Sequence, residues 1–119
     1  MHSHNGVKIV NVPVTVVTVT VTETQILVPK RFELRRWEAN EIPLGAKFKR
    51  WDKDEGQRIV GYNPSFGCIH YPAILLSGGK YPNHDNHYYL GDLVTSLSEP
   101  EYSFDGIEWF RCGVWEEVK

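Results

Sequence analysis

Thiol and imidazole side chains gather between residues 67 and 89, in the stretch GCIHYPAILLSGGKYPNHDNHYY. They are Cys68, His70, His84 and His87. One sulfur and three nitrogen ligands form a set that zinc accepts in tetrahedral geometry. On a strand, Cys68 and His70 would lie on one face, and the polar segment that follows could fold back over it. Because this spacing matches no standard zinc motif, a protein without a cofactor is the first hypothesis and zinc the alternative.

The same cysteine is the candidate for nucleophilic catalysis. Such chemistry needs Cys68 as a thiolate, with His70 or His84 as its base. Cys68 falls inside a predicted strand, so it lacks the helix N-terminus that activates many catalytic thiols. The chain also lacks a nucleophile elbow, a glycine-rich phosphate loop and a pair of catalytic carboxylates. The sequence therefore favours a protein that is not an enzyme, and we assign no catalytic residue.

Basic and aromatic side chains alternate in two segments, KRFELRRW and KFKRWDK. Arginine and lysine beside aromatic rings are the groups that bind single-stranded nucleic acids. Residues 30–58 carry 9 basic and 6 acidic residues, however, so the local excess is only +3. The other interpretation is that the rings are core and the basic stems lie over them. In the nucleic-acid alternative, the phosphate contacts come from Arg31, Arg35, Arg36, Lys47, Lys49 and Arg50.

Aromatic residues are abundant, with 4 Trp, 6 Tyr and 5 Phe in 119 residues. Tyrosine and tryptophan dominate the hot spots of protein interfaces, and this number exceeds what a small core easily buries. We therefore expect a surface that binds a protein or a small molecule. The other interpretation of Tyr88 and Tyr89 is a strand that buries one ring and exposes the next. The expected contacts are Tyr81, Tyr88, Tyr89, Trp37 and Trp51.

The strongest structural pattern lies before these segments, at residues 7–28 (VKIVNVPVTVVTVTVTETQILV). Valine and threonine alternate with period two, which predicts a β-strand with one half-buried face. The alternation changes phase between Val16 and Val17, as a β-bulge or a sharp bend would require. No Gly, Asn or Pro interrupts residues 14–28, so we expect one long strand or arm without a tight hairpin. An unpaired edge of that length promotes aggregation, which favours a homo-oligomer, most simply a dimer.

The rest of the chain predicts short elements separated by turns. Residues 29–41 fit a short helix slightly better than a strand, and Pro43 with Gly45 predicts a turn. Residues 46–62 alternate around the polar loop DKDEG, which predicts a hairpin. Further strands are expected in CIHYPAILL and on both sides of Gly113. The fold class is therefore all-β or β-dominated with at most one short helix, built as a small barrel or sandwich with a long N-terminal strand or ribbon.

Length and composition set the class of protein. The 119 residues suffice for one domain, and 41% hydrophobic residues can form a core. We expect residues 1–6 to be a flexible tail and residues 7–119 to be a single β-rich domain. There is no apolar run long enough for a membrane helix and no secretion signal, so we expect an intracellular, cytoplasmic protein without a membrane partner. In that compartment Cys68 and Cys112 would be reduced thiols.

The overall charge disfavours one class of partner. The net charge of −2 makes the whole chain a poor partner for polyanions. The function expected from the sequence is therefore a non-enzymatic interaction module that self-associates through residues 7–28. Such a module would suit an accessory protein of a phage or mobile element. Zinc binding and single-stranded nucleic-acid binding are the two alternatives.

Overall fold

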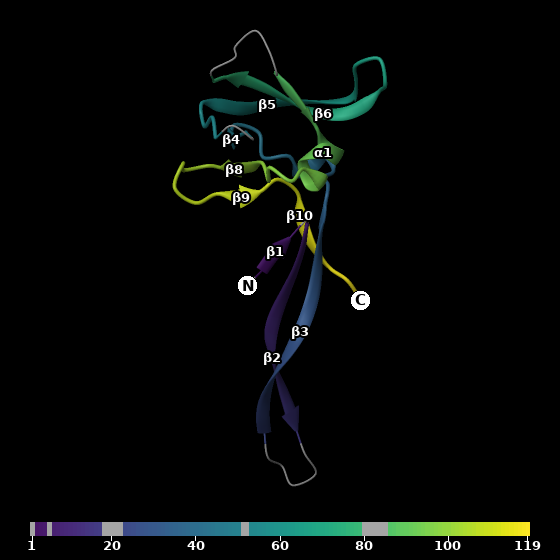
Figure 1. Cartoon of the computed structure of the whole chain (residues 1–119), viewed down its shortest axis with the longest axis vertical. Coiled ribbons are helices and arrows are strands. Elements are labelled where there is room, and N and C mark those ends of the chain that lie inside the picture. Colours follow the sequence, from purple (N-terminus) through teal and green to yellow (C-terminus); the bar gives the residue numbers. More distant parts are fainter. Residues whose placement is uncertain (1, 5, 18–22, 51–52, 80–85) are drawn as a thin grey trace.

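The protein consists of a globular body and a two-stranded arm that projects from it (Figure 1). The structure, a computed structural model, describes the chain except residues 1, 5, 18–22, 51–52 and 80–85, and it describes residues 2–4 by their backbone alone. The molecule measures 68 × 31 × 24 Å. The arm accounts for this elongation, because it extends along the longest axis.

The arm is an antiparallel pair of strands, β2 (Val7–Val17) and β3 (Glu23–Arg35). Their pairing is continuous from Val7 opposite Glu33 to Val17 opposite Glu23. At the base, β1 (His2–His4) pairs with β2, and β10 (Val114–Glu117) pairs with β3, so the sheet there has four strands. Residues 2–4, which the sequence places in a tail, therefore form an edge of this sheet.

Of the long strand or arm expected over residues 7–28, the uninterrupted strand is wrong, because β2 ends at Val17 and β3 returns beside it as the second strand of a hairpin. Five residues, 18–22, connect the two strands and lie outside the described residues. Two-residue hairpin loops demand Gly or Asn, whereas longer connections built on other turns accept most residue types. The absence of Gly, Asn and Pro therefore excluded a tight turn but did not exclude a hairpin.

The body is built on an antiparallel sheet of six strands in the order β7-β6-β5-β4-β8-β9. The sheet is curled, so that β5 and β6 lie at one end of the body and β8 and β9 near the arm (Figure 1). One short helix, α1 (Leu90–Thr95), follows β7 and packs against β6. The strands are β4 (Lys47–Lys49), β5 (Gln57–Phe66), β6 (Tyr71–Gly78), β7 (His87–Tyr89), β8 (Glu101–Ser103) and β9 (Phe110–Arg111).

This architecture confirms the β-dominated fold class, since two antiparallel sheets and one short α-helix account for the regular structure of the described residues. The hairpin around DKDEG is also confirmed, because β4 pairs with β5. The turn at Pro43 forms as expected, with the Ala46 N–H donating to the Pro43 carbonyl and Gly45 at a φ of +88°. Over the described parts of the chain, no helix is long and apolar enough to cross a membrane.

The helix expected over residues 29–41 is wrong. Strand β3 continues to Arg35, because Phe32 pairs with β2 on one side and β10 on the other, and Leu34 pairs with β10. Only Ala39–Glu41 forms a single 3-10 turn, η1. At this point in the fold, β3 forms backbone hydrogen bonds with both β2 and β10. These bonds outweigh a weak local preference for helix.

The hydrophobic core lies entirely in the body. Its largest fully buried hydrophobic side chains come from β4, β5, β6, α1 and the residue after β9: Phe48, Ile59, Ile74, Leu90, Leu93 and Cys112. Trp37, just beyond the arm, is buried with them and meets Tyr102 edge to face at 5.4 Å between ring centres. Neither β2 nor β3 contributes a fully buried side chain. The arm is therefore outside the core that stabilises the fold.

The joint between arm and body depends on Gly113 and Arg35. Gly113, with a φ of +132°, links β9 of the body to β10 of the arm base, and a Cβ there would lie 2.7 Å from the Arg35 carbonyl oxygen. The Arg35 guanidinium donates two hydrogen bonds to Glu41, at 2.9 and 3.0 Å, and one to Glu116, at 2.7 Å. The two bonds from Arg35 to Glu41, with a further one from the Glu38 N–H, lower the pKa of Glu41 from 4.5 to about 2.

Candidate functional site

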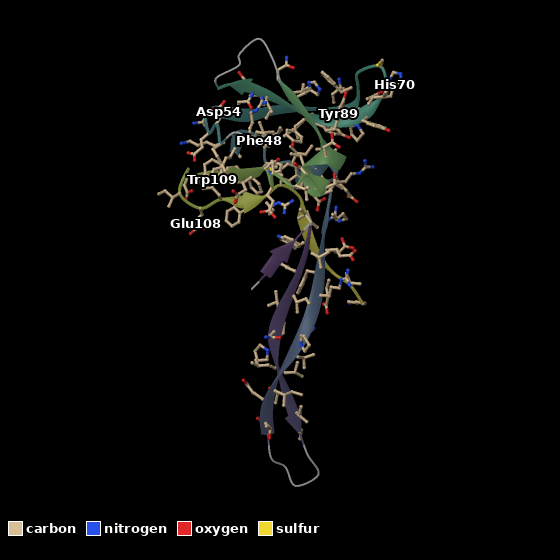
Figure 2. All side chains as sticks on the ribbon, viewed as in Figure 1. Phe48, Asp54, His70, Tyr89, Glu108 and Trp109 are labelled. Carbon is tan, nitrogen blue, oxygen red and sulfur yellow. The ribbon has the colours of Figure 1, made fainter. Side chains whose placement is uncertain are left out.

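One face of the arm is lined by aliphatic side chains. Paired residues of an antiparallel hairpin share a face, so the even-numbered residues of β2 and β3 lie together. On the outer half of the arm, Val14, Val16 and Ile26 remain 37%, 38% and 47% exposed. This half of the arm stands clear of the body (Figure 2). We define the apolar face as Val10, Val12, Val14, Val16, Ile26 and Val28.

The opposite face of the arm is mixed in character. It consists of the odd-numbered residues, and its aliphatic side chains, Ile9, Val17 and Leu27, are all exposed. Polar residues separate them along both strands: Asn11, Thr15, Glu23, Gln25 and Arg31. Only the apolar face is therefore a continuous hydrophobic surface.

Two lysines mark the body end of the apolar face. The Lys8 Nζ atom lies 4.3 Å from the centre of the Trp115 ring, close enough for a cation–π interaction. The Lys30 Nζ atom lies 3.4 Å from Glu117 Oε1. The even-numbered residues further out on β2 and β3 carry no charge. The face thus changes from charged at the base to uncharged toward the tip.

A second candidate surface lies on the body, where β5, β6 and β7 bring four rings together. The rings of Phe66 and His87 stack with their centres 4.1 Å apart, and Tyr89 meets both of them edge to face. Tyr71 meets Tyr89 at 5.8 Å and is 56% exposed. We call Phe66, Tyr71, His87 and Tyr89 the aromatic surface. Clustered, partly exposed rings of this kind are common at binding hot spots.

Of the five aromatic contacts expected from the sequence, Tyr89 belongs to the aromatic surface. Tyr88 points the other way and packs on the core, with its ring 5.7 Å from that of Phe48, so the strand alternation sets only one of the two tyrosines against the core. Trp37 is buried. Tyr81 and Trp51 lie outside the described residues. The pairing of β5, β6 and β7 adds Phe66 and Tyr71, which no local pattern connects to Tyr89.

Two hollows adjoin the aromatic surface, and both are lined by Arg36 and Pro72. The larger has a volume of about 340 Å³ and the smaller about 180 Å³. Within the described residues the Arg36 guanidinium has no hydrogen-bond or ion-pair partner. The larger hollow also has Trp37, Tyr62 and Leu90 in its wall, and the smaller has Tyr71, Tyr89 and Asp92.

The expected zinc ligands do not form a cluster in the described part of the chain. No three His, Cys, Asp or Glu side chains there are arranged to hold a metal ion. Cys68 and His70 lie in the turn at residues 67–70, so the argument that a strand places them on one face is wrong. His70 Nδ1 is 2.9 Å from Ser65 Oγ, and His87 belongs to the aromatic surface. His84 lies outside the described residues.

The basic residues considered for nucleic-acid binding are spread from the arm to the body. Arg50 is buried, whereas Arg36 and Lys47 have no ion-pair partner among the described residues. The other three have acidic partners: Arg31 with Glu33, Arg35 with Glu41 and Glu116, and Lys49 with Glu55 and Glu101. Their charge is thus partly neutralised within the chain, which weakens the attraction for phosphates.

The segment between β8 and β9 exposes apolar side chains that the sequence analysis did not single out. Phe104 is 67% and Ile107 82% exposed. The Asp105 carboxylate accepts hydrogen bonds from the Ile107 and Glu108 N–H groups and from the Ser103 hydroxyl, which together lower its pKa. The segment is therefore braced by its own hydrogen bonds. Its signal in the sequence is a pair of large apolar residues around Asp-Gly, where a polar turn is usual.

No protein-family model matches the chain, and comparisons with curated proteins and with solved structures give no match. The function is therefore argued from the three exposed surfaces described above. Of these, the apolar face is a continuous row of aliphatic side chains on a regular element.

Proposed function

We propose that the chain is a non-enzymatic binding module that self-associates through its arm. The apolar face is the observation that carries this proposal. Its outer half is exposed, and the arm contributes no side chain to the core. Contiguous apolar surfaces on soluble proteins usually mark interaction sites, and an uncovered strand pair is otherwise a risk for aggregation. A second surface that covers the apolar face removes both costs.

The chemistry of the cysteines fits a protein that binds rather than catalyses. Burial raises the pKa of the Cys112 thiol well above its ordinary value, so this sulfur is a packed core atom and not a nucleophile. Cys68 is exposed in a turn and, like Cys112, is a free thiol. Free thiols in a chain with two cysteines agree with the cytoplasmic location that we propose.

The aromatic surface is our proposed contact for a protein or small-molecule partner on the body. Its rings come from three adjacent strands, which hold them in fixed relative positions. Arg36, whose guanidinium has no partner among the described residues, lines the smaller hollow together with Tyr71 and Tyr89. Arginine and tyrosine together are the side chains most enriched at hot spots. The arm would assemble the protein, and the body would carry the recognised surface.

Zinc binding and single-stranded nucleic-acid binding stay as alternative proposals with narrower support. The zinc proposal keeps Cys68, His70, His84 and His87, and native mass spectrometry of protein purified without chelator tests it through the mass of one zinc per chain. The nucleic-acid proposal relies most on Arg36 and Lys47. Binding of a labelled oligonucleotide that weakens steeply with salt would support it.

Sedimentation velocity tests self-association through the arm. We expect the wild-type chain to sediment increasingly fast from micromolar to near-millimolar concentration. A variant with threonine at both exposed sets of aliphatic positions should stay monomeric, with an unchanged far-ultraviolet circular dichroism spectrum, because threonine is β-branched and favours strands. The substituted residues are Ile9, Val14, Val16, Val17, Ile26 and Leu27. A wild-type chain that stays monomeric throughout would overturn the proposed function.

A further inference from the structure

The smaller hollow beside the aromatic surface carries one charged side chain of each sign. Arg36 and Asp92 both line it, and both are exposed. Among the described residues, neither the Arg36 guanidinium nor the Asp92 carboxylate has a hydrogen-bond or ion-pair partner, so the two do not bond to each other. Their charged atoms therefore lie more than 4.0 Å apart on the wall of one hollow. A ligand that contacts both would supply the partner that each of them lacks.

A glycine leaves space beside these two charges. Gly91 is the second residue of α1 and also lines the smaller hollow. Its φ is not positive, and a Cβ added to it would meet no described atom within 4 Å. Glycine weakens a helix relative to alanine, and neither backbone conformation nor close packing requires it at this position. What the missing side chain provides is open space at the hollow.

Two tyrosine rings form further walls of the smaller hollow. The planes of Tyr71 and Tyr89 lie at 89° to each other, with ring centres 5.8 Å apart. The sheet fixes both positions, because Tyr71 begins β6, Tyr89 ends β7, and the two strands are paired. Aromatic rings arranged around a cavity bind alkylated ammonium groups, since the ring faces attract a cation. A carboxylate in the same hollow adds Coulombic attraction for that cation.

The volume of the smaller hollow sets the size of its ligand. The hollow measures about 180 Å³. This equals roughly six water molecules at about 30 Å³ each. Sites for drug-sized ligands start near about 300 Å³. A ligand of about six to ten non-hydrogen atoms therefore matches the hollow, which is the size of one free amino acid.

We propose that the smaller hollow binds a small zwitterion. Its carboxylate bonds to the Arg36 guanidinium, and its alkylated ammonium group lies against Asp92 and the rings of Tyr71 and Tyr89. The planar guanidinium offers a carboxylate two parallel N–H donors. An N-alkylated α-amino acid and its fully methylated betaine share this chemistry. The inference rests on the proposed binding surface of the body, whose ligand class it names, and it does not depend on the arm.

The exposure of the site predicts weak binding. Arg36 and Asp92 are both exposed, so water and salt screen their contacts with a ligand. For trimethylglycine, a betaine within the size limit, we expect a dissociation constant of about 1 mM. The affinity should fall as sodium chloride is added, because both contacts are between charges.

Nuclear magnetic resonance titration of the full chain tests the location of the site. Trimethylglycine, and in a separate titration proline, should shift the backbone amides around Tyr71, Tyr89 and Asp92, with saturation near the expected dissociation constant. Tighter binding of trimethylglycine would assign the betaine, and tighter binding of proline the free amino acid. Shifts that do not saturate at about twenty times that constant would overturn the inference. Saturating shifts that lie outside the hollow would also overturn it.

Two charge variants with matched controls test the contacts. Arg36→Gln and Asp92→Asn should each raise the dissociation constant of trimethylglycine by about tenfold, because each removes one charged partner. Lys47→Gln and Glu108→Gln make the same changes of charge outside the hollow and should leave it within about twofold. Equal effects of the hollow variants and the controls would show that net charge alone is responsible, and the inference would fail.

Ligands with a single charge test whether both ends are recognised. Acetate keeps the carboxylate and tetramethylammonium keeps the cation, so each should bind at least about tenfold more weakly than trimethylglycine. Arg36→Gln should weaken the binding of acetate alone, and Asp92→Asn that of tetramethylammonium alone. Acetate or tetramethylammonium that binds as tightly as trimethylglycine would overturn the zwitterion. Failure of every ligand would overturn this inference, whereas sedimentation velocity decides self-association through the arm independently.

Discussion

The arm and the body are both made of alternating strands, yet they differ in what covers those strands. In β5 and β6 the inward side chains, Ile59 and Ile74, are fully buried beneath α1 and the segment around Trp37. In β2 and β3 the corresponding row includes Val14 and Ile26, which stay more than a third exposed. A period-two pattern therefore identifies an apolar face, but it does not identify the layer that buries it.

This difference divides the stability of the protein unequally. Two-stranded ribbons are marginal in water by themselves, so the arm depends on β1 and β10 at its base and on any partner that covers its face. The body has its own core and does not need the arm for burial. Substitutions should therefore have large effects on folding in the body, intermediate ones at the joint, and small ones in the arm.

The largest expected effect is in the core of the body. Phe48→Ala removes a ring of β4 that is completely buried and packs against the ring of Tyr88. The cavity should lower the free energy of unfolding by about 3–5 kcal/mol in urea denaturation followed by tryptophan fluorescence. A loss below about 1 kcal/mol would show that the body tolerates substitution as well as the arm does. The expected difference in stability between the two regions would then be absent.

The joint should be the next most sensitive position. Gly113→Ala places a Cβ 2.7 Å from the Arg35 carbonyl oxygen, at a φ of +132° that other residues rarely adopt. Strain of this kind costs about 1–3 kcal/mol, which thermal denaturation should detect. Gly45→Ala is the matched control, because Gly45 also has a positive φ but no atom lies within 4 Å of its added Cβ. Equal losses in the two variants would show that backbone strain alone, and not the arm–body contact, sets the cost.

A pH-dependent effect is expected at the same joint. The pKa of Glu41 is lowered from 4.5 to about 2 by Arg35, so the ionised carboxylate stabilises the folded state above pH 4.5. That stabilisation is lost as the pH falls from 4.5 toward 2. Glu41→Gln should therefore melt a few degrees below the wild type at neutral pH. This difference in melting temperature should disappear as the pH falls from 4.5 toward 2. A difference that persists at pH 2 would show that charge is not its cause.

The smallest effect on folding is expected in the arm. Ile26→Thr changes a side chain that is 47% exposed and keeps the β-branch, so the unfolding free energy of the dilute monomer should change by less than about 0.5 kcal/mol. The same substitution should still weaken association at high concentration. A large loss in dilute solution would mean that the arm belongs to the folding core and would remove the distinction between the two regions.

Local patterns predicted the strands whose signals are strong. The alternation of Val10 to Val16 gave the apolar face, and the polar loop DKDEG gave the hairpin of β4 and β5. Residues 29–41 fitted a short helix slightly better than a strand, although Phe32 and Leu34 alternate as in a strand, and the helix was the wrong choice. Only the edges offered by β2 and β10 decide it, and these come from residues far away along the chain.

The candidate surfaces divide in the same way. The alternation of Tyr88 and Tyr89 limited the outward ring to one of the two, but the sheet decided that it is Tyr89. The neighbours of Tyr89 could not be foreseen, because Phe66 and Tyr71 reach it through the pairing of β5, β6 and β7. The shared strand face expected for Cys68 and His70 is wrong for the same reason, since the start of β6 depends on its partner strand.

Composition and periodicity, which act over a few residues, were enough to specify a β-rich chain with an apolar row along its first strand. They act locally because side chains on a strand alternate whatever lies across from them. The return of β3 beside β2, the crossing at Gly113 and the placement of the core in the body alone are long-range features. They depend on which segments meet in space, and the contacts between those segments decided them.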